Sequence, residues 1–110
     1  MSVNFDEAII DIEKLRDYCL NLNHPVGRHK AVVFKKRLDL TSDDADELQG
    51  IIAERIRLSE YKETFSDEYG KRFYIDIIIN RFDKVETVRT LWILKRDETI
   101  PRFVSCYVKN

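Results

Sequence analysis

Apolar residues recur at steps of three and four positions through most of the first half of the chain, which is the spacing of amphipathic helices. Asn4 can cap a first helix. The residues NLNHPVG at 21–27 favour a turn, and a second, short helix is expected from about Arg28. Thr41 or Ser42 can cap a third helix, whose first turn is acidic, as the helix dipole favours. The expected buried faces of the helices comprise Ala8, Ile12, Leu15, Cys19, Ala31, Phe34, Leu38, Ala45, Leu48, Ile52 and Ile56.

After residue 59 the apolar residues alternate with polar ones, which is the spacing of half-buried strands. The segment 61–80 indicates two strands around a turn at 66–70, and the segments 85–96 and 102–109 supply a third and a fourth strand. No helix fits between consecutive strands, so the sheet should be antiparallel, because parallel neighbours need a crossover. We therefore predict an α+β fold in which two or three N-terminal helices pack on one face of a four-stranded antiparallel sheet. The sheet residues expected in the core include Ile75, Ile77 and Val104.

The composition is that of a folded globular protein, because 44% of the 110 residues are hydrophobic and 35% are charged. We expect a single domain over residues 1–110. The longest apolar runs are far shorter than the ~20 residues of a membrane-spanning helix, and no export signal is recognisable. We therefore expect no membrane association and a cytoplasmic location. Cys19 and Cys106 have no metal-ligand spacing, so free thiols are expected, with neither a metal nor another cofactor.

Charge points to a local rather than a general site for nucleic acid. The formal net charge is −1, which gives no overall attraction to phosphates. Arg28, His29 and Lys30 nevertheless form a basic group at the predicted start of the second helix. Backbone N–H groups and the helix dipole favour an anion there, and an imidazole can move protons near neutral pH. The alternative is structural: His24 stabilises the turn, while Arg28 and Lys30 are solvated.

The last two strands carry a second group of polar side chains. Alternation places Ser105 and Tyr107 on one face of the fourth strand, and the third strand offers Arg89 on one face and Trp92 on the other. A cation that stabilises the charge on a phosphorane, beside an imidazole or phenol that moves a proton, can cleave RNA without a metal ion. The alternative is again structural. Arg89 and Arg102 would form ion pairs across strands, and Trp92 and Tyr107 would belong to the core.

Four segments, LNLNHPVGRHKAVVF, DEYGKRFYIDIII, VRTLWIL and PRFVSCYV, together resemble an uncharacterised family of small bacterial domains. That family has a Gly-x-x-Lys-Ala helix start, here Gly-Arg-His-Lys-Ala, and an ending similar to Pro-Arg-x-Val-[Ser/Thr]-Cys-Tyr. The resemblance covers roughly residues 12–108 and implies a domain encoded beside small partners or at the ends of larger secreted proteins, as toxin modules are. The motif residues matched by position are Gly27, His29, Lys30, Phe34, Gly70, Asp76, Arg89, Trp92, Arg102, Ser105 and Tyr107.

The order of helices before four strands is similar to the fold of the ribonuclease toxins barnase, colicin D and RelE. Many such toxins are clearly basic, and this chain departs from them in being slightly acidic. The leading interpretation is a metal-independent ribonuclease-like toxin domain that acts on RNA phosphodiesters. Lys30 and Arg89 would hold the phosphate, and His29 would act as general acid or base. The candidate catalytic residues are His29, Lys30, Arg89, Ser105 and Tyr107, and the candidate substrate-binding residues are Arg28, Trp92 and Arg102.

A non-catalytic function remains the alternative. The domain would then be a protein-binding module of the immunity or antitoxin type, whose polar sheet face contacts another protein. The near-neutral charge favours this interpretation, whereas the basic helix start and the hydroxyl groups of the last strand favour the ribonuclease. An RNA substrate and a cognate antitoxin or immunity protein are accordingly the expected partners.

Overall fold

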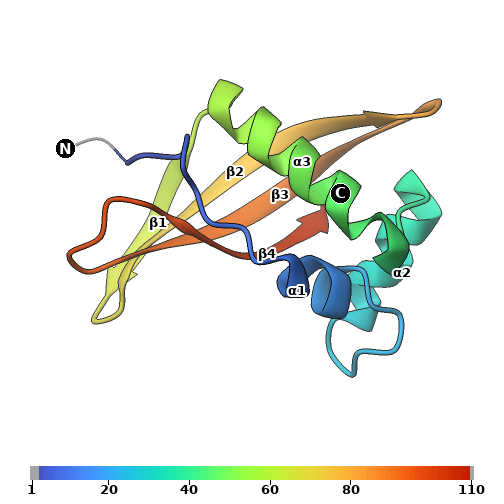
Figure 1. Ribbon diagram of the computed structural model, residues 1–110, viewed down its shortest axis with the longest axis horizontal. Helices are drawn as coiled ribbons and strands as arrows, with labels where there is room; N and C mark the ends of the chain where they lie inside the picture. The colour runs from blue at the N-terminus through green and yellow to red at the C-terminus, as the bar shows by residue number, and fades with distance from the viewer. Residues whose placement is uncertain (1–2, 110) are drawn as a thin grey trace.

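The computed structural model describes residues 3–109 and confirms the predicted α+β class (Figure 1). Short helical elements occupy the first half of the chain, and the strands follow. The helical elements are α1 (Ile12–Lys14), a π-helical turn η1 (Leu15–Cys19), α2 (Arg28–Leu38), η2 (Ser42–Asp44), α3 (Ala45–Arg55) and η3 (Ile56–Leu58). The strands are β1 (Lys62–Asp67), β2 (Gly70–Arg81), β3 (Lys84–Lys95) and β4 (Arg102–Val108).

The four strands form one sheet in the order β1-β2-β3-β4, and each neighbouring pair is antiparallel, as predicted. In Figure 1, α3 lies lengthwise over the sheet, and α1 and α2 lie near the end of β4. Ile75 and Ile77 of β2 face these helices and are buried, whereas Ile78 is largely exposed on the other side. We call this other side the open face. It carries alternate side chains of β2, β3 and β4, among them Tyr74, Asp76, Ile78, Val85, Arg89 and Tyr107.

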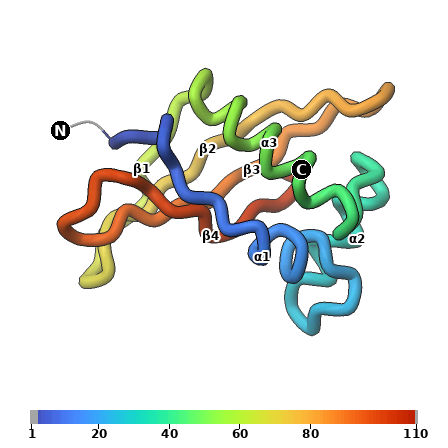
Figure 2. Tube along the Cα trace, viewed as in Figure 1, coloured from blue at the N-terminus to red at the C-terminus, as the bar shows by residue number. Residues whose placement is uncertain are grey.

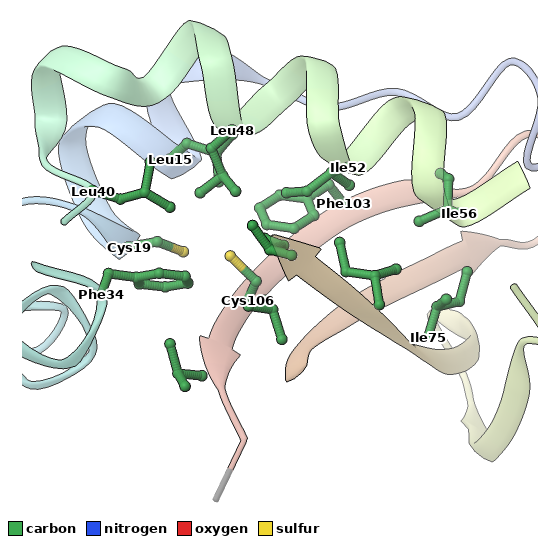
Figure 3. Close-up of a cluster of buried hydrophobic side chains, with 14 of the residues drawn as sticks. Leu15, Cys19, Phe34, Leu40, Leu48, Ile52, Ile56, Ile75, Phe103 and Cys106 are labelled. Carbon is green, nitrogen blue, oxygen red and sulfur yellow. The ribbon is translucent and has the colours of Figure 1, made fainter. Parts of the chain in front are cut away.

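The core lies between the helices and the sheet, and most of its expected members are buried (Figure 3). Phe34 of α2 and Leu48 and Ile52 of α3 have no exposed surface, because the helical spacing directs them all toward the sheet. Ala8 and Ile12 are exceptions among the residues expected in the core, since they are only partly buried. In the sheet the exception is Val104, which is half-buried.

A β-bulge in β4 explains this difference. Ser105 pairs with Leu91 of β3 and Phe103 pairs with Trp92, so Val104 has no partner on the neighbouring strand. An extra residue in one strand interrupts the alternation of side chains. Ser105 and Cys106, which follow the bulge, are consecutive buried residues. Between Ser105 and Tyr107 the pairing with β3 is regular, as the prediction that these two residues share a face requires, although Ser105 is buried and Tyr107 is only half-buried.

The first predicted helix forms only over residues 12–19. Upstream of it, the Asn4 side chain accepts a hydrogen bond from the N–H of Asp6 at 3.1 Å and makes a turn instead of capping a helix. Ile9 then forms a parallel bridge beside β4, where the N–H of Phe103 donates to its carbonyl at 2.8 Å. Figure 2 shows this N-terminal segment alongside β4. Its backbone groups bond to the sheet edge, so they are not available to a helix.

The longest helices, α2 and α3, have 11 residues each. Within residues 3–109, no helix is long and apolar enough to cross a membrane.

Candidate functional site

The loop before α2 is organised around His24. Its Nδ1 atom accepts hydrogen bonds from the N–H groups of Val26, at 3.0 Å, and Gly27, at 2.9 Å. The His24 carbonyl also accepts from the N–H of Arg28, at 3.1 Å. The structural expectation for His24, that it stabilises the turn, is confirmed. Because Nδ1 is the acceptor, the ring hydrogen of the neutral imidazole is on Nε2.

Gly27 allows this loop to approach the π-helical turn η1 closely. A Cβ atom at Gly27 would lie 2.9 Å from the carbonyl carbon of Tyr18 and even closer to its oxygen. The Tyr18 ring in turn packs edge-on against the His24 ring, with the centroids 4.8 Å apart. The loop and η1 are therefore held together through both their backbones and their rings.

Lys30 connects this region to the sheet. Its Nζ atom donates hydrogen bonds to the Tyr18 hydroxyl at 3.2 Å and to Ser105 Oγ at 3.0 Å. Ser105 Oγ lies 3.6 Å from the Sγ atom of Cys19. We call Tyr18, Cys19, His24, Lys30 and Ser105 the Lys30 cluster.

The charge of Lys30 is not balanced locally. None of the ion pairs within residues 3–109 includes Lys30. An ammonium group has three hydrogens, and the two hydrogen bonds described above use two of them. Lys30 is partly exposed, whereas Ser105 is buried. The cluster thus joins a buried hydroxyl to a partly exposed cation that has no carboxylate partner among residues 3–109.

Two thiols lie at the buried end of the cluster. Cys19 comes from η1 and Cys106 from β4, both are free, and their sulfur atoms point toward each other (Figure 3). Hydrogen bonding by the Cys106 thiol, opposed by burial, lowers the pKa of Cys19 from 9.0 to about 6, with smaller contributions from Ser105 and Lys30. Burial raises the pKa of Cys106 well above its ordinary value, and the neighbouring Cys19 adds to this effect. The two thiols therefore differ strongly in acidity.

A second polar cluster lies on the open face, around Arg89 of β3. Arg89 binds Asp76 through two hydrogen bonds, from Nε at 2.8 Å and from Nη2 at 3.0 Å. The guanidinium also lies 4.0 Å from the centre of the Tyr74 ring, and Tyr107 is the partner of Arg89 on β4. Hydrogen bonding to Arg89 lowers the pKa of Asp76, and Lys109 adds a hydrogen bond at 3.3 Å. The ion-pair interpretation of Arg89 is confirmed.

The structure therefore divides the predicted catalytic residues between two places. Lys30 and Ser105 are in contact in the first cluster, and Arg89 and Tyr107 are neighbours in the second. His29 is exposed on the first turn of α2, as is Arg28. The Ser105 hydroxyl lies within 3.6 Å of Cys19 Sγ and accepts a hydrogen bond from Lys30, whereas Tyr107 is paired with Arg89 on β3.

Two predicted substrate-binding residues are already engaged within the protein. Trp92 is only 1% exposed, and its Nε1 donates to the Thr90 hydroxyl at 2.8 Å. The indole therefore belongs to the core, as the structural alternative proposed. Arg102 pairs with Glu98 at 3.1 Å near the surface.

Sequence reasoning did not include Tyr18 and Cys19 among the site residues, and it gave His24 only a structural role. The available signal was the short distance in sequence between His24, Gly27 and Lys30, which places them on one turn and the following helix start. Nothing in the sequence indicated that Tyr18 would meet Lys30. Within residues 3–109, no three His, Cys, Asp or Glu side chains are arranged to hold a metal ion.

Together these features define a small α+β domain in which one lysine joins a helix start to the hydroxyl of the last strand. The chain belongs to a family described as a domain of unknown function, DUF6883, whose sequence model matches residues 2–110. This finding agrees with the resemblance to an uncharacterised family of small domains. No curated protein and no solved structure matches the chain.

Proposed function

We propose that the domain is a metal-independent ribonuclease-like toxin module that cleaves RNA phosphodiesters at the Lys30 cluster. The observation that supports this proposal most directly is the position of Lys30, which has no carboxylate partner within residues 3–109 and bonds two hydroxyl groups. A partly exposed cation without a counter-ion is suited to binding an anionic group. The sequence resemblance to toxin modules, given above, supports the choice of RNA as substrate.

The chemistry assigned to each residue follows from its contacts. The Lys30 ammonium would bind a non-bridging oxygen of the scissile phosphate and stabilise the charge that develops in the phosphorane. The Tyr18 and Ser105 hydroxyls hold the ammonium in position, because both accept hydrogen bonds from it. Tyr18 also contacts the His24 ring, whose Nε2–H can donate to a phosphate oxygen.

His29 is the candidate for the base that takes the 2′-hydroxyl proton. His24 can act only as a hydrogen-bond donor, because its Nδ1 accepts two backbone hydrogen bonds and its Nε2 carries the ring hydrogen. His24 contacts Tyr18 within the Lys30 cluster, whereas His29 is the exposed residue directly before Lys30. An imidazole must reach the 2′-hydroxyl proton directly or through one water. The two roles predict different variants: His29→Gln should abolish cleavage, whereas His24→Gln should remove only a hydrogen bond to the phosphate and lower the rate less.

The test of the proposal is the effect of Lys30→Met on the cleavage of a mixed RNA in the presence of EDTA. Methionine keeps a flexible apolar chain but removes the charge, so the cleavage rate should fall by about 10²-fold or more. The matched control is Lys36→Met, an exposed position on the same helix, which should leave the rate unchanged. Circular dichroism establishes that both variants are folded. A wild-type protein that leaves the RNA intact, or a Lys30→Met variant with full activity, refutes the proposal.

A second candidate function is a protein-binding module of the immunity or antitoxin type that uses the open face. The observation that favours it is an apolar pair on that face, since Ile78 is 60% and Val85 57% exposed and the two are diagonal neighbours on β2 and β3. Exposed aliphatic side chains beside tyrosine and arginine are typical of interface centres. Ile78→Asp should then weaken binding to a small protein encoded beside the chain by at least about tenfold in calorimetry. Lys30→Met should leave that binding unchanged.

A further inference from the structure

The two cysteines are separated by most of the sequence but meet in the core. Cys19 belongs to the π-helical turn η1, and Cys106 belongs to β4 next to the bulge. Neither side chain has exposed surface, and in Figure 3 the two sulfur atoms point toward each other. The proposed ribonuclease chemistry uses neither of them.

The surroundings of the pair are polar on one side only. Phe34 and Leu48 are among the apolar core residues around it, whereas Ser105 Oγ lies 3.6 Å from Cys19 Sγ. Ser105 is bonded to Lys30, which is partly exposed. Cys19 is therefore two side chains away from solvent, with a cation on the path. Turns of π-helix are uncommon and occur often at functional sites.

We propose that Cys19 and Cys106 are an intramolecular redox pair that a hydroperoxide converts into a disulfide. The nearby ammonium favours the thiolate form of Cys19, which is the form that reacts with peroxides. Ser105 and Lys30 lie on the Cys19 side of the pair, and Cys106 is the less acidic thiol, so Cys106 acts second. The proposal does not depend on RNA cleavage, and either can fail without the other.

The reaction takes place in two balanced steps. The Cys19 thiolate attacks one oxygen of the peroxide, the O–O bond breaks, and the other oxygen leaves as hydroxide or alkoxide and takes up a proton. Cys19 is then a sulfenic acid. The Cys106 sulfur attacks the Cys19 sulfur, the S–O bond breaks, and water leaves with the Cys106 proton. Two thiols have been oxidised by two electrons, and one peroxide has been reduced to water and an alcohol, or to two waters.

The test is mass spectrometry of the intact wild-type protein after exposure to hydrogen peroxide. We expect a loss of about 2 Da, the disappearance of both titratable thiols under denaturing conditions, and the recovery of both after reduction. The matched control is Cys106→Ala, in which Cys19 cannot be resolved and should instead gain about 16 Da and react with a sulfenic-acid reagent. The wild-type measurement decides the outcome even where the variant does not fold.

Three results would overturn the proposal. The first is that the wild-type protein gains oxygen, by about 16 or 32 Da, without losing about 2 Da. The second is a disulfide that links two chains, seen as a dimer on a non-reducing gel. The third is that both thiols survive a peroxide treatment that fully oxidises free cysteine in the same solution.

Discussion

Replacing Gly27 by alanine tests whether the close approach of the loop to η1 is required for the fold. The new Cβ atom would be 2.9 Å from the Tyr18 carbonyl carbon, whereas ordinary van der Waals contact begins near 3.4 Å. The atoms in conflict are backbone atoms on both sides, so no flexible side chain can move away. The loop must therefore shift by at least about half an ångström. Hydrogen bonds of Gly27 oppose this shift, because its N–H donates to His24 Nδ1 and its carbonyl accepts from the N–H groups of Lys30 and Ala31.

The expected change in the free energy of unfolding of Gly27→Ala follows from two opposing effects. Forced overpacking of this kind costs about 1–3 kcal/mol. The alanine also reduces the conformational entropy of the unfolded chain, which raises the free energy of unfolding by about 0.4–1 kcal/mol. We therefore expect Gly27→Ala to lower the free energy of unfolding by about 1–2 kcal/mol. Gly50 provides the matched control, because it lies within α3 and a Cβ there would meet nothing within 4 Å. Gly50→Ala should raise the free energy of unfolding by about 0.5–1 kcal/mol.

Urea denaturation of the two variants and the wild type measures both effects. The fluorescence of Trp92, which is buried in the native core, reports the transition. The midpoint should move down for Gly27→Ala and up for Gly50→Ala, with the slope of the free energy against urea unchanged. If Gly27→Ala gained as much stability as Gly50→Ala, the steric account of the loop would be refuted.

Two further predictions concern the core and the thiols. Phe34→Ala should lower the free energy of unfolding by about 3–5 kcal/mol in the same assay, because Phe34 is fully buried, and a loss below about 1 kcal/mol would contradict its placement. The ultraviolet absorbance of thiolate should titrate with a midpoint near pH 6 and be absent in Cys19→Ser, because the pKa of Cys19 is lowered to about 6. Since that pKa is below the ordinary value of 9.0, the stability that this group contributes is complete above about pH 9 and is lost as the pH falls toward 6.

The fold could be predicted where the periodicity of apolar residues is unbroken. The alternation from Phe73 to Ile79 places β2 with the correct face toward the helices, and the stripe of α3 identifies Leu48 and Ile52 as core residues. The predicted helix does not form over residues 5–11. The helical spacing of Ala8 and Ile12 competes there with a backbone bridge between Ile9 and the edge of β4. That bridge joins residues more than ninety positions apart, so no local pattern reveals it.

The site could be predicted only in part for a similar reason. The basic helix start and the polar last strand were identified as two groups, and Lys30 and Ser105 do meet. Strict alternation assigned Val104 to the core, whereas this residue has no partner on β3 and is only half-buried. A bulge depends on the register with the neighbouring strand, which the sequence of β4 alone does not contain.

The bridge between Ile9 and β4 has a consequence for the order in which the domain can form during synthesis. The N-terminal segment bonds to residues 99–103, and Lys30 reaches its hydroxyl partner at Ser105. A ribosome releases the helical half first, at about 5–20 residues per second, but that half cannot complete its hydrogen bonds until β4 has left the exit tunnel. Contacts between distant parts of a chain also slow folding. The Lys30 cluster is therefore assembled among the last parts of this domain, and a chain whose synthesis stops before β4 lacks it.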